Sequence, residues 1–150
     1  MAKPAFEVKG DKALIRKLAA LGNAGPRVAK GSVFEVASKI EARAKDLVPV
    51  RNIGGGALRA SGHSTVEAQG LEVVGKVGFG GPAAPYALAV HENPRAGKTG
   101  GVSPRGKPYR SWAEVGQWKY LETAFKELAR TLVAVTKQRM AREVRRAAAS

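Results

Sequence analysis

The sequence predicts an α+β fold: a small antiparallel sheet packed against a long helix from the N-terminal half and a long C-terminal helix, with extended loops. Three observations lead to this prediction. Apolar residues recur at helical spacing near both ends of the chain, residues alternate in character in its middle, and glycines and prolines cluster between these segments. With 150 residues, the chain fits a single domain spanning 1–150.

Two helices are expected in the N-terminal half. Asp11 is a plausible N-cap for a short helix that stops at Gly22-Asn23, and Gly25-Pro26 then separates it from a second helix over about 27–47. Pro49 ends the second helix, because proline cannot continue the helical hydrogen bonds. Its apolar positions follow the helical period: Val33, Val36, Ala37, Ile40, Ala44 and Leu47.

The middle of the chain reads as a flexible loop over about 51–57 followed by strands. Alternation predicts strands within 58–65 and 66–79, with Gly70 in a turn or bulge, and a short strand over 86–90. A second flexible loop is expected over about 92–116, where glycine and proline recur.

The last element is a helix over about 119–147. Its apolar stripe includes Leu121, Phe125, Leu128, Leu132, Val135, Met140 and Val144. A helix of this length exceeds what the core of so small a domain needs, so we expect its far end to project or to contact a partner.

Catalytic and metal chemistry find little support in the residues. Cysteine is absent, and His63 and His91 are the only histidines. On a strand, His91 and Glu92 would point in different directions, which makes them a poor acid–base pair. We therefore expect no catalytic residues, no metal site and no cofactor. A small nuclease or hydrolase that uses His91 and Glu92 is the third of three hypotheses.

The most unusual feature of the composition is its net charge of +14. Such charge attracts nucleic acid, anionic lipid or acidic protein surfaces, so a basic nucleic-acid-binding protein is the alternative function. We expect most of the charge to face protein neighbours or solvent rather than DNA. No apolar run approaches the length of a membrane span and the N-terminus lacks a signal-peptide pattern, so a soluble protein made in the cytoplasm is expected.

Five segments occur in an order that is typical of one family. They read Leu14-Ile-Arg-Lys-Leu18, Val48-Pro-Val-Arg-Asn-Ile-Gly-Gly-Gly-Ala-Leu-Arg-Ala-Ser61, Val77-Gly78, Pro85-Tyr-Ala-Leu-Ala-Val-His-Glu92 and Lys119-Tyr-Leu-Glu-Thr-Ala124. Across nearly its whole length the chain resembles the small tail-component or tail-completion proteins of long-tailed bacteriophages, encoded among the head–tail connector genes. It departs from their pattern where Asn-Ile-Gly-Gly is inserted before Gly56.

This resemblance implies a non-enzymatic virion protein at the neck of the phage, assembled in the host cytoplasm. It implies a homo-oligomeric ring, with a hexamer favoured and a dodecamer left open. The implied partners are the connector or stopper and the tail terminator or tube proteins, close to the genomic DNA and without contact to a membrane. Whether the ring lines the DNA channel is open.

Two groups of residues are singled out. Those expected at an interface with a neighbouring subunit or partner are Arg51, Arg59, His91, Glu92, Trp112, Arg142 and Arg145. Those expected in the core are Leu58, Tyr86, Val90, Leu121 and Phe125. For Arg51 and Arg59, a simple solvated position is an equal alternative.

Overall fold

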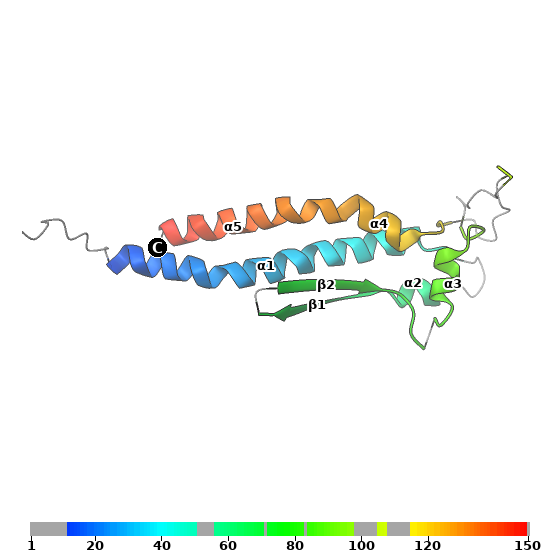
Figure 1. Ribbon diagram of the computed structural model, residues 1–150, viewed down its shortest axis with the longest axis horizontal. Coiled ribbons are helices and arrows are strands. Elements are labelled where there is room, and N and C mark those ends of the chain that lie inside the picture. The colour runs from blue at the N-terminus through cyan, green and yellow to red at the C-terminus, as the bar shows by residue number, and fades with distance from the viewer. Residues whose placement is uncertain are drawn as a thin grey trace, which may run out of the picture.

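The computed structural model describes residues 12–50, 56–70, 72–82, 84–97, 105–107 and 115–149. A long helix, α1 (Lys12–Leu47), forms the central layer (Figure 1). The helices α4 and α5 return antiparallel along one side of α1, and the hairpin of β1 and β2 packs on another. This arrangement confirms the predicted α+β class, with both long helices and the antiparallel sheet.

The two helices expected in the N-terminal half form a single helix, α1. α1 runs unbroken through Gly22-Asn23 and Pro26, where the sequence predicted a stop. A proline inside a helix leaves the carbonyl four residues earlier without its donor, but Gly22 and Pro26 both lie on the exposed side, where water can satisfy it. On the opposite side, Ala24 and Val28 are buried and continue the apolar face across the proline. Burial on both sides of Pro26 therefore outweighs its local preference.

The hairpin consists of β1 (His63–Gln69) and β2 (Glu72–Gly78), joined at Gly70, whose φ of 60° only glycine adopts freely. Its register pairs Ser64 with Val77 and Val66 with Gly75. A Cβ at Gly75 would lie 2.7 Å from Cγ1 of Val33, so this glycine allows β2 to approach α1 closely.

Two segments expected as strands are helical. Residues 58–60, expected at the start of a strand, lie in the single helical turn α2 (Ala57–Ala60). The segment expected as a strand over 86–90 forms α3 (Ala87–Glu92). In α3, Ala87 is buried and Val90 packs against the core. These residues are three apart, so the core selects a helical turn where alternation of large and small residues suggested a strand.

The C-terminal helix consists of α4 (Tyr120–Leu128), a 3-10 turn η1 (Ala129–Thr131) and α5 (Leu132–Ala149). Three ion pairs link it to α1 at regular intervals. Their N–O distances are 2.8 Å each, and they join Arg43 to Glu127, Arg139 to Glu35, and Arg27 to Glu143. Because the α1 partners follow at two-turn steps, these pairs mark one antiparallel register between the helices.

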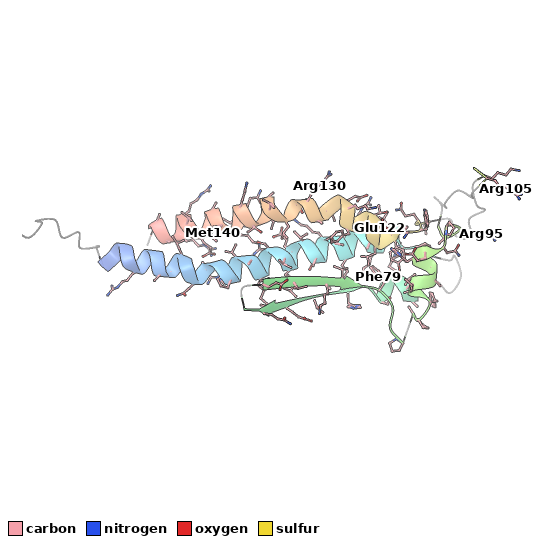
Figure 2. All side chains as sticks on the ribbon, viewed as in Figure 1. Phe79, Arg95, Arg105, Glu122, Arg130 and Met140 are labelled. Atoms are coloured by element: carbon pink, nitrogen blue, oxygen red, sulfur yellow. The ribbon has the colours of Figure 1, made fainter. Side chains whose placement is uncertain are left out.

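The core lies at the end of the molecule where α1 meets α2, α3 and α4. Its buried side chains are Val36, Ile40, Ala44, Val48, Leu58, Ala84, Ala87, Tyr120 and Ala124. Phe79, just after β2, stands edge-on against Tyr120 with ring centroids 5.2 Å apart (Figure 2). The predicted core position of Leu58 is confirmed, and this core fixes the surfaces described next.

Candidate functional site: an apolar groove and a basic stem

An apolar groove of about 760 Å³ lies between the hairpin and the C-terminal helices. α1 forms its floor, β2 forms one wall, and α4, η1 and α5 form the other. The groove residues are Val33, Val36, Ala37 and Ile40 of α1, residues 73–77 of β2, His91 of α3, and Leu121, Glu122, Phe125, Ala129 and Leu132 of the C-terminal helices. Its size falls within the range of sites that bind a ligand or a side chain of a partner.

The wall formed by β2 is the edge of a sheet. In the described parts of the chain the sheet has two strands, so β2 pairs with β1 along one edge only. Five consecutive residues of β2 line the groove, so the backbone of its second edge borders the groove as well as its side chains. Such an edge presents backbone donors and acceptors to any segment that approaches it.

The opposite wall carries Phe125, whose side chain is 58% exposed. The prediction that Phe125 lies in the core is wrong. Tyr120 and Ala124 turn the inner face of α4 toward α1, and Phe125 follows Ala124 by about 100° around the helix, which directs it into the groove. A large aromatic side chain in this position is available to a partner.

His91 and Glu92 lie at one end of the groove. They meet, against expectation: Nδ1 of His91 lies 2.8 Å from Oε1 of Glu92, because the two residues end a helix rather than a strand. Nζ of Lys119 lies 2.8 Å from Glu92. The hydrogen bond from Lys119, and then that with His91, lower the pKa of the Glu92 carboxyl.

The same cluster fixes the start of α4. Lys119 adopts a left-handed conformation with φ 54°, and its N–H donates to the carbonyl of His91 over 2.9 Å. The His91 ring stands edge-on against Tyr120 at 4.9 Å, and burial raises the pKa of the Tyr120 phenol to about 12. Nε2 of His91 is buried and has no hydrogen-bond partner among the described residues. The cluster joins α3 to α4 and thereby holds α4 in place as a wall of the groove.

The second surface is a basic stem, defined here as residues 12–30 of α1 and 137–149 of α5. These two segments lie side by side beyond the tip of the hairpin, at the end of the molecule where α1 begins and α5 finishes (Figure 1). They contain ten basic residues and one acidic residue, Glu143. The rest of the chain from 31 to 136 contains fourteen basic and nine acidic residues. The positive charge is therefore concentrated at one end.

The remaining predicted site residues are distributed over several elements. Arg142 and Arg145 are exposed on α5 in the stem, and Arg59 is exposed on α2, far from them in the fold. Arg51 and Trp112 lie outside the described residues. The five described residues expected at an interface thus do not form one surface in a single chain.

Of the other residues expected in the core, Val90 and Leu121 are half-buried and pack against it. Tyr86 is 46% exposed, so its prediction as a core residue is wrong. It precedes α3 as the N-cap, and Ala87 takes the buried position instead. Leu88, which was not singled out, is 73% exposed on α3.

The groove itself was not predictable from the sequence. Val74 is exposed and lines the groove, but nothing in the alternation along this strand indicated that β2 borders a hollow. The stem includes four arginines that lie close together near the C-terminus of the sequence, Arg139, Arg142, Arg145 and Arg146. That it also includes the first half of α1 follows only from the antiparallel packing of α1 and α5.

Comparison with protein-family models, with curated proteins and with solved structures found no match to this chain. Within the described ranges, no group of three His, Cys, Asp or Glu side chains is placed to hold a metal ion. No helix in this part of the chain is both long and apolar enough to cross a membrane.

Proposed function

We propose that this chain is a structural, non-enzymatic subunit of a tailed-bacteriophage virion that forms a ring at the head–tail junction. In this role it helps to join or stabilise the connector and the tail tube, with the connector or stopper and the tail terminator or tube proteins as neighbours. The order of its five motifs supports this function through resemblance. The subunits would assemble in the host cytoplasm into a hexamer, with a dodecamer as the alternative.

The apolar groove is the observation that carries the proposal, and we assign a second copy of the chain as its occupant. The groove leaves Phe125 and the free edge of β2 uncovered. The same chain presents a different apolar surface, Tyr86 and Leu88 beside and on α3, which does not line the groove. Contact between two unlike surfaces is head-to-tail, and such contacts close into a ring when their rotation completes a circle.

The charge distribution favours the same contact. Two stems that carry ten basic residues and one acidic residue each repel one another. The part of the chain that contains the groove is much closer to charge balance, and Glu122 and Lys76 on its walls supply both signs. Copies therefore meet through the groove with the stems kept apart.

Mass photometry of the purified chain tests this proposal with two matched variants. Phe125→Glu places a charge in the groove, whereas Val133→Glu places one at a 63% exposed position of α5 that does not line it. We expect the wild type and Val133→Glu to form particles of six times the 15.8 kDa chain, and Phe125→Glu to remain monomeric.

Two results would count against the proposal in different ways. If Phe125→Glu assembled like the wild type, the groove would not be the contact between copies. If the wild type stayed monomeric at every concentration, alone and with connector and tail proteins, the ring itself would be wrong. Both substituted side chains are exposed, so circular dichroism should show unchanged folding in each variant.

A further inference from the structure

Four arginines gather around one small hollow in the stem, between α1 and α5. The hollow has a volume of about 210 Å³ and is lined by Arg27, Val28, Arg139, Arg142, Glu143 and Arg146. Glu143 forms ion pairs with two of them: Oε2 lies 2.8 Å from Nη2 of Arg27, and Oε1 lies 3.5 Å from Nη1 of Arg146. One carboxylate thus serves two of the four guanidinium groups.

The ion pairs at this hollow are easily exchanged. The side chains of Arg27 and Arg146 are largely exposed, and exposed ion pairs contribute little to stability because water screens them. A phosphate group offers a guanidinium the same two-oxygen geometry as a carboxylate, with more negative charge. Arg27 and Arg146 can therefore turn from Glu143 to a phosphate at small cost.

Further arginines extend the site along α5. Arg142 and Arg145 are exposed and form no ion pair with any described residue. The α5 part of the stem, residues 137–149, is about 20 Å long at 1.5 Å per residue. The phosphates of one DNA strand advance by about 3.4 Å along the duplex axis, so a segment of this length lying parallel to that axis runs past about six of them. The surface fits an extended chain of phosphates better than a single anion.

A nucleic acid fits this surface better than the other anionic partners. The stem of a second copy is excluded as a partner, because it carries the same charge. A membrane-bound helix needs a wide exposed apolar face. Among the stem side chains that the structure describes, Val144 is the one exposed large apolar side chain, whereas Val28 is buried and Leu21 and Met140 are half-buried.

We infer that the stem is a binding surface for the phosphate backbone of duplex DNA, independent of base sequence. This inference departs from the sequence-based expectation that most of the charge faces protein neighbours or solvent. The reason is that folding brings two basic segments, far apart in the sequence, onto one end of the molecule. It does not depend on assembly into a ring, since the hollow and its arginines belong to one chain.

Fluorescence anisotropy with a labelled duplex of arbitrary sequence tests the inference on the full chain. The stem variant carries Arg142→Gln and Arg145→Gln. The control carries Arg59→Gln and Arg130→Gln. These two arginines are exposed, lie outside the stem and form no ion pair with a described residue. Figure 2 shows Arg130 on the outer side of the C-terminal helices. We expect the stem variant to bind roughly tenfold or more weakly at 0.1 M salt, and its slope of log K against log salt to fall by about 2.

The control should bind like the wild type, and a duplex of different sequence should bind equally well. Equal losses in both variants would show a diffuse charge effect and overturn the inference. The inference would also be overturned if the chain bound anionic phosphatidylserine vesicles or polyglutamate as tightly as DNA and the stem variant lost that binding to the same extent. Repeating the titration with Phe125→Glu separates the two proposals, because DNA binding should persist there even if assembly is lost.

Discussion

Gly75 tests directly whether the hairpin rests on α1. In the structure this glycine faces α1, and an added Cβ would lie 2.7 Å from Cγ1 of Val33 and 3.5 Å from Cβ of Ala37. The shorter distance is below any normal carbon–carbon contact, so Gly75→Ala must push β2 away or force Val33 from its rotamer. Either response weakens the contact between the hairpin and α1.

The magnitude follows from two opposing effects. Overpacking costs about 1–3 kcal/mol, while replacing glycine by alanine stabilises by about 0.4–1 kcal/mol through the unfolded chain. The net loss therefore lies between about 0 and 2.6 kcal/mol, and its middle value of about 1.3 kcal/mol lowers Tm by about 3–5 °C in a chain of this size. By contrast, Gly22→Ala lies on the exposed side of α1 with open space around it and should stabilise by about 0.5–1 kcal/mol.

Urea denaturation followed by circular dichroism measures these differences. The double variant Gly75→Ala with Val33→Ala should recover part of the loss, with a coupling energy of about 0.5–2 kcal/mol between the two sites. If Gly75→Ala were as stable as the wild type, and Val33→Ala behaved additively with it, the hairpin would not pack on α1 as described. The wall of the groove would then be misplaced as well.

Two further predictions concern the helical pair. Pro26→Ala should raise the unfolding free energy by about 1–3 kcal/mol, because Pro26 is exposed inside α1 and costs about 3 kcal/mol relative to alanine there. Urea denaturation measures this gain, and its absence would indicate that the helix breaks at Pro26 in solution. The pKa of Glu127 is lowered by Arg43, and that of Glu35 by Lys39 and then Arg139. Carboxyls whose folded pKa lies below the unfolded value of 4.5 stabilise the fold above that pH and lose this contribution as the pH falls through the folded pKa. Thermal denaturation should show a Tm that falls below about pH 4.5, and a Tm that rises there would contradict the ion pairs.

The main elements were predictable from the sequence because burial imposes a period on it. The apolar positions of α1 and of the C-terminal helix repeat at helical spacing, and the alternation before and after Gly70 is that of a half-buried hairpin. Errors arose where local signals and burial disagree. Pro26 reads as a helix boundary, yet the buried faces of Ala24 and Val28 carry α1 through it.

Short segments were the least predictable. The alternation of Tyr86-Ala-Leu-Ala-Val90 suits a strand, but a spacing of three between Ala87 and Val90 suits a helical turn equally, and only the core decides between them. This single error also misplaced Tyr86 and separated His91 from Glu92. His91 and Glu92 are the last two residues of α3, and side chains that point about 100° apart on a helix would point to opposite faces on a strand.

The two candidate surfaces depend on long-range packing, which periodicity does not report. The groove requires α1, β2 and α4 to diverge at one place, although the sequence of each element reads as ordinary core. The stem requires residues 12–30 to lie beside 137–149, and the three cross-helix ion pairs that set this register join residues far apart in the chain. Net charge gave the sign of the surface but not its place.

Cryo-electron microscopy of the phage particle that carries this chain tests the central claim most directly. The account predicts a closed ring of copies between the connector and the tail tube, with Phe125 and the free edge of β2 covered by the neighbouring copy. A particle without this chain at the junction, or a ring in which the groove of every copy faces solvent, would contradict it.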